Sequence, residues 1–272
     1  MRIQHNMTAA NTNRMLGITN DNVAKSAEKL SSGFKINRAA DNAAGLKISE
    51  KMRGQIRGLN QASINAQDGI SMVQTAEGAL NETTSILQRM RELTVQAAND
   101  TNVAADRESI KEEIEQLEKE ITRIGSQTEF NKMRLLNGTL SGKNLQVGAN
   151  TKQNISFAIK DMRATALSVA TIHTQVSSYA NATSAITTID NAIVAVTAQR
   201  SALGAIQNRL EHTIANANNT SENLQTAESR IRDVDMAAEM VNYSKDGILQ
   251  QAAQSMLAQA NQASQGILSL LR

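Results

Sequence analysis

The side chains that most often bind metals or carry out catalysis are few and scattered in this sequence. The three histidines, His5, His173 and His212, are far apart, and no two have the four-residue spacing of a helical zinc motif. The sequence therefore predicts isolated polar or surface histidines and no metal site. The chain contains no Cys, which excludes disulfide bonds, thiolate metal ligands and a cysteine nucleophile.

Two further patterns would support catalysis only with partners that the sequence lacks. Ser26 and Lys29 have the spacing of serine acyl enzymes, but the companion SDN and KTG motifs are missing, so we expect an ordinary exposed helix turn. Asp233 and Asp235 are two residues apart on a predicted helix and point to different sides, which prevents them from acting as a general acid–base pair. No P-loop or dinucleotide-binding motif is present. We therefore expect no enzyme activity and no cofactor.

The charges of the chain are distributed unevenly. Residues 1–60 contain ten Lys or Arg and four Asp or Glu, whereas residues 61–149 contain nine and thirteen. The basic segment could bind nucleic acid, but Phe34 is its one side chain able to stack on a base, and no DNA-reading motif is present. The simpler interpretation is that the basic segment of one copy meets the acidic segment of another, so we expect no nucleic-acid partner.

The composition also argues against a membrane protein and against a conventional globular core. No apolar run approaches the roughly 20 residues needed to cross a bilayer, so we expect no membrane insertion. Residues 1–20 lack the apolar region of a cleavable signal peptide, and we expect none. Aromatic residues make up only 2% of the 272 residues, although they are the usual bulky filler of a core.

The elements that position these residues are predicted mainly as long helices. Over residues 48–90, apolar residues recur at steps of three or four, which predicts a helix over about residues 42–99, roughly 87 Å long at about 1.5 Å per residue. A heptad pattern predicts a second helix around residues 110–124. A third stretch, residues 186–270, keeps nearly one phase and predicts a supercoiled helix with some breaks. The absence of Pro leaves nothing that obliges these helices to stop.

A different pattern separates the second and third helices. Period-two alternation at residues 145–147 and 155–159, together with the turn signal Asn137-Gly138, predicts a small β-hairpin region over residues 131–172. Residues 174–188 are rich in Ser, Thr, Ala and Asn, and we expect them to form a surface loop.

These patterns predict a mainly α fold: long antiparallel helices that form a coiled-coil rod, a small β-hairpin region, and N- and C-terminal helices that pair. The Ala-rich terminal stretches bury little area at about 25 cal/mol per Å², while ordering the backbone costs about 1–2 kcal/mol per residue. We therefore expect the two ends to become fully helical only when neighbouring copies add buried surface.

Strings at both ends of the chain resemble the signatures of bacterial flagellins. The string LSSGFKINRAADNAAGLKISE at residues 30–50 is similar to the N-terminal signature, and AESRIRDVDMA at residues 227–237 is similar to the C-terminal one. Further matching strings lie at residues 68–80, 127–131, 256–262 and 267–272. The resemblance extends over the chain except for about residues 174–190. One departure is Ser264, near which many relatives have a Pro.

The resemblance implies a structural subunit that polymerises into the bacterial flagellar filament for swimming motility. Such a subunit is exported unfolded by the flagellar type III apparatus, assembles at the distal tip, and is extracellular. This chain resembles a minimal form without large outer domains. The implied domains are an inner filament core (residues 1–41 and 232–272), an outer core (residues 42–173 and 191–231) and a short variable surface segment (residues 174–190).

The resemblance also implies sites and partners. The chain would polymerise with itself through apolar residues of the two ends packed against each other: Met7, Met15, Ile18, Val23, Leu30, Val234, Val241, Ile248, Met256, Ile267 and Leu270. An export chaperone would bind the C-terminal helix, and filament cap and hook–filament junction proteins would contact the subunit. A host Toll-like flagellin receptor would contact Arg89, Leu93 and Glu113. Exposed hydroxyls that could carry glycans are Ser177, Ser178, Thr183, Ser184, Thr187 and Thr188.

Three alternatives remain open on the sequence alone. The hook–filament junction protein has similar end signatures, but the string at residues 127–131 and the hairpin region favour flagellin. An enzyme in the variable region would need more room than residues 174–190 provide. A nucleic-acid binder would show steeply salt-dependent binding.

Overall fold

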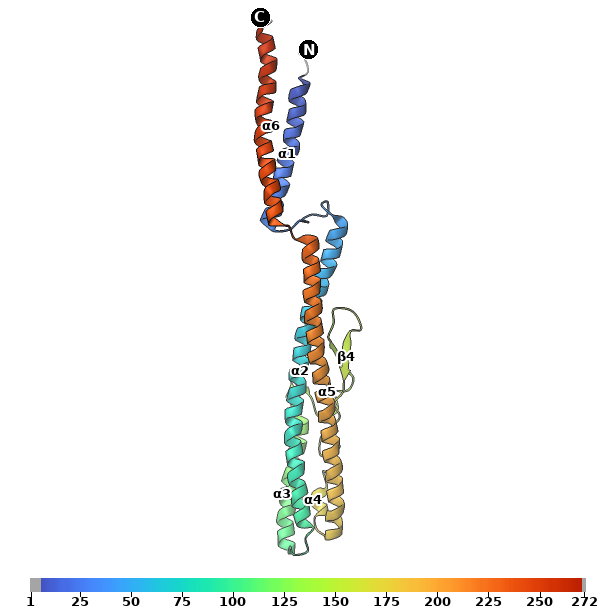
Figure 1. Cartoon of the computed structure of the whole chain (residues 1–272). Helices are drawn as coiled ribbons and strands as arrows, with labels where there is room; N and C mark the ends of the chain where they lie inside the picture. Colours follow the sequence, from blue (N-terminus) through green and yellow to red (C-terminus); the bar gives the residue numbers. More distant parts are fainter. Residues whose placement is uncertain (1–5, 271–272) are drawn as a thin grey trace. The chain divides into compact units, whose positions relative to one another are not determined.

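A computed structural model of the chain describes the backbone of residues 6–270 and the side chains of residues 6–263. The elements follow in the order α1 (Met7–Ser32), α2 (Ala43–Ala97), α3 (Ala104–Gln127), β1 (Glu129–Phe130), β2 (Met133–Arg134), β3 (Lys143–Gln146), β4 (Asn154–Phe157), α4 (Ile172–Gln175), α5 (Tyr179–Arg232) and α6 (Met236–Leu270) (Figure 1). The chain divides into a terminal unit, Met1–Gly54 with Glu222–Arg272, and a central unit, Gln55–Ser221. The predicted mainly α fold with long helices is confirmed.

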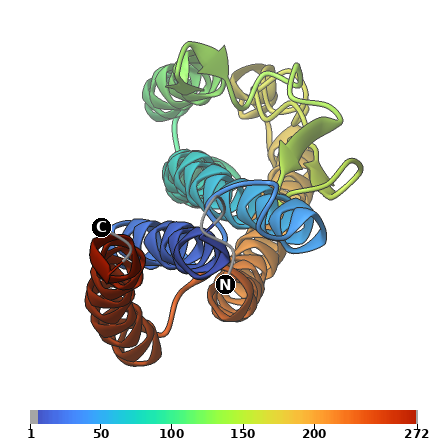
Figure 2. The same cartoon turned by 90° about the horizontal axis from the view of Figure 1, so that it is seen from above.

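In the terminal unit, α1 and α6 lie side by side, which confirms the predicted pairing of the terminal helices (Figure 1, Figure 2). Asn6 caps the start of α1, where its Oδ1 accepts a hydrogen bond of 3.1 Å from the Ala9 N–H. Gly33 ends α1 at φ +75°, a left-handed conformation that glycine adopts without steric cost. Asp235 caps α6 by accepting hydrogen bonds from two N–H groups of its first turn.

The seam between α1 and α6 contains small and polar side chains. The less exposed positions of α1 recur at steps of three and four, as in a heptad repeat. They are Ala9, Thr12, Leu16, Thr19, Val23, Ser26 and Leu30. Four of these seven side chains are Ala, Thr or Ser, which let the two helices approach closely but remove little apolar area from water. Leu16, Val23 and Leu30 are the larger, half-buried apolar members.

Polar contacts join the two helices along this seam. Asn6 Nδ2 donates a hydrogen bond of 3.0 Å to the Ala260 carbonyl. Gln250 Nε2 donates one of 2.9 Å to Asn20 Oδ1. Each bond is satisfied at one relative position of the helices, so together they specify the register of the pair.

Glu239 makes a third polar contact across the seam. Its Oε1 lies 3.5 Å from Lys29 Nζ, and its side chain is only 12% exposed. Burial by itself would raise the pKa of Glu239, but a hydrogen bond from Ser26 and the positive charge of Lys29 outweigh it and lower the pKa below its usual value. The expected exposed helix turn at Ser26 is therefore wrong, because Ser26 is buried against α6.

The connectors that join α1 to α2 and α5 to α6 pair with each other. Phe34 and Asp233 form an antiparallel bridge, and the Arg232 guanidinium lies 4.8 Å from the centroid of the Phe34 ring. Arg232 also forms an ion pair of 2.6 Å with Glu50. The prediction that Asp233 and Asp235 lie on a helix is wrong: one forms the bridge and the other caps α6.

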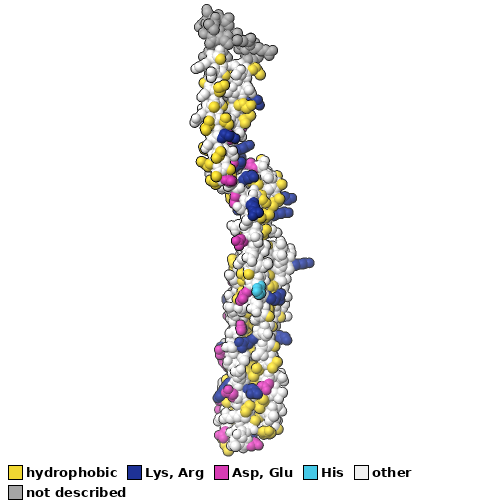
Figure 3. Space-filling model, in the orientation of Figure 1, with side chains coloured by type: hydrophobic (Ala, Val, Ile, Leu, Met, Phe, Trp, Pro, Cys, Tyr) yellow, Lys and Arg dark blue, Asp and Glu magenta, His cyan; other side chains and the backbone are white. Residues whose placement is uncertain are grey.

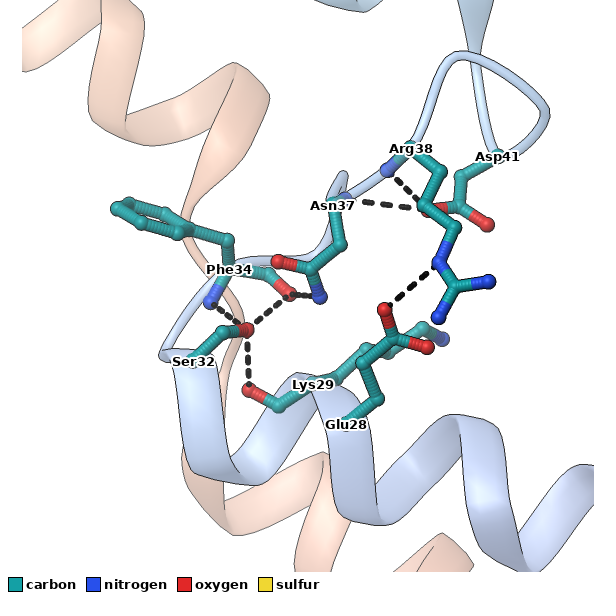
Figure 4. A network of polar contacts seen from close by, with 7 residues as sticks. All are labelled: Glu28, Lys29, Ser32, Phe34, Asn37, Arg38 and Asp41. Carbon is teal, nitrogen blue, oxygen red and sulfur yellow. Dashed lines mark hydrogen bonds and ion pairs between the residues drawn. The ribbon is translucent and has the colours of Figure 1, made fainter.

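A polar network orders the first connector (Figure 4). Arg38 Nε donates a hydrogen bond of 3.0 Å to Glu28 Oε1 on α1. The Asp41 carboxylate accepts hydrogen bonds from the N–H groups of Arg38 (2.9 Å) and Asn37 (3.1 Å). These two N–H groups hold the pKa of Asp41 below its usual value.

In the central unit, α2, α3 and α5 enclose the main apolar core (Figure 1, Figure 2). The periodic residues that predicted the helices lie in it, among them Leu80, Leu87 and Met90 of α2, Ile114 and Ile121 of α3, and Ile189 and Leu203 of α5. The predicted helix over residues 42–99 is observed as α2, and the heptad at residues 110–124 lies within α3. The predicted third helix is interrupted at residues 233–235 and forms α5 and α6.

The β-hairpin region covers one side of this core. Strands β3 and β4 are antiparallel, and Leu145 faces Ile155 in their register. Ile155 and Phe157 are buried while Ser156 between them is exposed, as the period-two alternation predicts. A second hairpin, β1–β2, was not predicted, because its strands of two residues are too short to show alternation.

The predicted surface loop at residues 174–188 is mostly wrong. Helix α4 ends at Gln175 and α5 begins at Tyr179, so only a short connection separates them. Ala182, Ala185 and Ile189 of α5 are buried at steps of three and four. Small alanines form this stripe, and the neighbouring Ser and Thr residues conceal it in the sequence.

Candidate self-assembly surface

The terminal unit exposes a series of large apolar side chains. Met7 is 70% exposed, Val241 69% and Ile248 68%. Seven further exposed apolar side chains of α1 and α6 are Met15, Ile18, Met236, Met240, Tyr243, Leu249 and Met256. We call these ten residues the assembly surface. Figure 3 shows apolar side chains along the α1–α6 pair on the face in view.

Helical phase directs Val241 and Ile248 of this surface away from the seam. Gln250, which contacts α1, lies nine residues after Val241, half a turn out of phase at about 3.6 residues per turn. Ile248 is seven residues after Val241 and shares its face. The α6 side that carries Gln250 therefore faces α1, while the opposite side presents Val241 and Ile248 to solvent.

The assembly surface provides enough apolar area for association. Burying a large apolar side chain completely contributes about 1.5–3 kcal/mol, so covering a half-exposed one contributes about 1 kcal/mol. Covering ten such side chains would contribute on the order of 10 kcal/mol before the costs of association. Exposed apolar surfaces of this kind mark interaction sites.

The predicted polymerisation residues therefore fall into two groups. Val23, Leu30 and Val234 are half-buried within the terminal unit. Met7, Met15, Ile18, Val241, Ile248 and Met256 are exposed in the single chain, and their role in polymerisation stays a prediction. The side chains of Ile267 and Leu270 lie outside the described residues.

The three predicted receptor residues occupy two environments in the central unit. Arg89 of α2 donates a hydrogen bond of 3.0 Å from Nε to Glu113 Oε1 of α3, and both side chains are exposed. Hydrogen bonds to Glu113 and Glu92 raise the pKa of Arg89. Leu93 is only 2% exposed and belongs to the core. Arg89 and Glu113 are thus available at the surface, and Leu93 supports the helix beneath them.

The predicted hydroxyl positions lie around the start of α5. Ser177, Thr183, Ser184 and Thr187 are exposed, whereas Ser178 and Thr188 are half-buried. Within α5, the hydroxyls of Thr183, Ser184 and Thr188 donate to the backbone carbonyl four residues earlier. They are presented by a helix and not by a flexible loop.

His173 has a structural role that its sequence neighbourhood does not reveal. Its backbone N–H donates to Glu118 Oε1 at 2.9 Å, and its Nδ1 lies 2.6 Å from Glu118 Oε2. Glu118 is 5% exposed on α3, so this pair attaches α4 to α3. The expectation of an isolated histidine is wrong for His173, since residues 55 positions apart meet only in the fold. His212 is exposed, and His5 lies outside the described residues.

The described part of the chain carries neither a metal cluster nor a membrane-spanning helix. No group of three metal-ligating side chains is found there. None of the described helices has the length and apolarity of a membrane span. Gly58 packs closely on Ala149, so that a Cβ at Gly58 would lie 2.8 Å from the Ala149 Cβ, whereas Gly54 has open space around it.

Comparison with protein families decides what this architecture is. Residues 3–141 match the model of the bacterial flagellin N-terminal helical region, and residues 186–271 match that of the C-terminal helical region. The chain belongs to the bacterial flagellin family. Among flagellins, it is 55% identical to the flagellin of Halalkalibacterium halodurans over 272 residues, and 52% identical to that of Bacillus subtilis over 304 residues. The whole of each chain is covered in both comparisons.

Solved structures agree with this membership. The crystal structure of Bacillus cereus flagellin is similar with a TM-score of 0.50 at 33% identity, over 57% of this chain and 88% of that one. A putative flagellar hook-associated protein from Vibrio parahaemolyticus gives a TM-score of 0.61 over 71% of this chain and 100% of that one. Its identity of 14% shows a shared fold alone.

Membership in the flagellin family establishes the general function. The chain is a structural subunit of the extracellular bacterial flagellar filament, which serves motility, and it is not an enzyme. In this family the subunit is exported through the flagellar apparatus and added at the filament tip. The small size of the chain fits a flagellin without large outer domains.

Proposed function

We propose that the assembly surface of α1 and α6 is where one copy of this flagellin packs on another in the filament. The observation that carries the proposal is the phase of α6: Val241 and Ile248 point outward although a partner helix of the same chain lies beside them. A second copy is the occupant that the family supplies, because the protein polymerises with itself.

The experiment introduces two negative charges into this surface. In the full chain, Val241→Asp with Ile248→Asp should block elongation of filament seeds, because two carboxylates would enter an apolar interface. Gln254→Asp is the control for adding a single carboxylate to α6, since Gln254 is an exposed residue on a different side of the helix from Val241. Sedimentation and electron microscopy measure elongation, and circular dichroism compares helix content. Normal elongation of the double variant would reject the proposal.

We also propose how the two units divide the filament. Residues 1–41 and 232–272 would form the inner core, residues 42–173 and 191–231 the outer core, and residues 174–190 a short outer segment. The exposed apolar side chains of the terminal unit support an inner position, because that is where every side of a helix pair meets other copies. The charged outer faces of α3 support a more peripheral position for the central unit.

Further partners are proposed from the same surfaces. An export chaperone would cover the apolar side of α6 before assembly, with Val241 and Ile248 as its contacts. The filament cap and hook–filament junction proteins would meet the subunit where another copy otherwise would. A host Toll-like flagellin receptor would contact the exposed Arg89–Glu113 pair. Leu93 would not touch the receptor and would hold α2 in place through its packing in the core. Glycans would attach to exposed hydroxyls around the start of α5, of which Ser177 is an example.

A further inference from the structure

The methionines that the structure describes are sorted between the two units. Met7, Met15, Met236, Met240 and Met256, all on α1 and α6, are between 47% and 70% exposed. In the core of the central unit, Met72, Met90 and Met162 are at most 5% exposed. Met133 on β2 is 44% exposed, and Met52 is half-buried. Half of the ten residues of the assembly surface are therefore methionines open to solvent.

We propose that these five methionines are a peroxide-sensitive modification site that controls self-assembly of the free subunit. The proposal rests on the proposed function of the assembly surface. The reagent is hydrogen peroxide or an alkyl hydroperoxide. Methionine is the apolar side chain whose character such a reagent changes reversibly, since the thioether becomes a polar and chiral sulfoxide.

The chemistry needs only the thioether and the peroxide. A sulfur lone pair attacks the terminal peroxide oxygen, the O–O bond breaks, and a sulfur–oxygen bond forms. The sulfur loses two electrons, which the peroxide gains. The leaving group, hydroxide from hydrogen peroxide or alkoxide from an alkyl hydroperoxide, takes up the proton of the transferred hydroxyl and departs as water or as the alcohol. No metal or further reductant is required, and exposure of the sulfur controls the rate.

Oxidation of the five methionines should weaken self-assembly, because all five lie on the assembly surface. Each sulfoxide adds a strong hydrogen-bond acceptor to an apolar surface, and burying that acceptor against another copy leaves it without a donor. The core of the central unit keeps its apolar packing, because Met72, Met90 and Met162 are shielded from the reagent, and Met133 on β2 is exposed outside that core. Assembly in turn covers the same sulfurs, so the free subunit is sensitive and the filament is protected.

The experiment treats free full-length subunits and preformed filaments with hydrogen peroxide and maps sulfoxides by peptide mass spectrometry. In free subunits, Met7, Met236 and Met256 should be oxidised well before Met90. The critical concentration for seeded elongation should rise roughly tenfold or more, with unchanged helix content. The same methionines should react much more slowly in filaments. Oxidation of Met90 at the same rate as Met256 would overturn the proposal.

Two variants assign the effect. The first replaces all five methionines by Leu, and the second carries Met133→Leu alone. For each variant, the measurement is its critical concentration after peroxide treatment divided by its critical concentration before treatment. A change in assembly that the Leu substitutions themselves cause therefore cancels in this ratio. The five-site variant should give a ratio near one, and Met133→Leu should behave like the natural chain. A large ratio in the five-site variant would reject these sites.

Enzymatic repair provides a test that needs no substitution. Methionine sulfoxide reductases applied to oxidised subunits should return the critical concentration to its untreated value. Failure to recover after mass spectrometry shows complete reduction would reject control by these sulfurs. The double variant Val241→Asp with Ile248→Asp tests the surface separately. If it elongates normally while peroxide still blocks assembly, the proposed surface has failed and the oxidation effect has not.

Discussion

Leu93 and Arg89 belong to the same stretch of α2 that is proposed to contact a receptor, but the structure gives them different roles, and a substitution of Leu93 tests this difference. Arg89 and Leu93 are one helical turn apart on α2, yet Arg89 is exposed and Leu93 is 2% exposed in the core. Removing a buried leucine side chain costs the transfer free energy of its atoms and leaves a cavity, about 2–5 kcal/mol together. We expect Leu93→Ala to destabilise the central unit by about 3 kcal/mol.

The measurement is urea unfolding of the full chain followed by circular dichroism. At a slope of about 2–3 kcal/mol per M, Leu93→Ala should lower the unfolding midpoint by about 1 M or more. Val95→Ala is the matched control on the same helix, because Val95 is 48% exposed and its truncation should change the free energy of unfolding by less than about 1 kcal/mol. Arg89→Ala should leave the midpoint nearly unchanged, since its ion pair is solvent-exposed.

A receptor reporter assay then distinguishes a surface contact at Arg89 from a core role of Leu93. Arg89→Ala should reduce activation of a host Toll-like receptor reporter while the protein is fully folded. Leu93→Ala should reduce it only in proportion to the unfolded fraction at the assay temperature. If Leu93→Ala unfolds at the same urea concentration as Val95→Ala, Leu93 does not support the core and the reasoning is refuted.

Two further predictions follow from buried polar groups. Glu118→Leu removes both hydrogen bonds to His173 and should lower the free energy of unfolding of the central unit by about 1–3 kcal/mol; a thermal melt that matches the natural chain would contradict this. The lowered pKa of Glu239 means that its contribution to the α1–α6 pair is present above the carboxyl's unfolded pKa, about 4.3, and is lost as pH falls through the lower folded value. Helix content measured between pH 6 and pH 3 should therefore fall on acidification, and Glu239→Gln should weaken that dependence; an identical pH profile for the variant would contradict the assignment.

The residue pattern by itself determined the helices and their partners in broad terms. Steps of three and four in apolar residues record which side of a helix is buried. They placed α2 within two residues of its observed bounds and found the middle of α3, which begins six residues before the predicted heptad. Period two did the same for β3 and β4, because alternate side chains of a strand face opposite sides. The pattern failed at residues 179–188, where small alanines form the buried stripe and polar neighbours dominate the composition.

Only the tertiary structure decided which apolar residues stay inside the chain. Leu93 and Ile248 are both large aliphatic residues within helices, yet Leu93 is buried and Ile248 is exposed. Apolar periodicity shows that a helix has an apolar face, but it does not show what covers that face. The partner of Glu118 was also invisible, since His173 meets it through backbone folding and not through spacing. The sequence therefore determined a flagellin and its long helices, while the packing of α1 on α6 decided which apolar residues of the two ends are covered within the chain and which stay exposed.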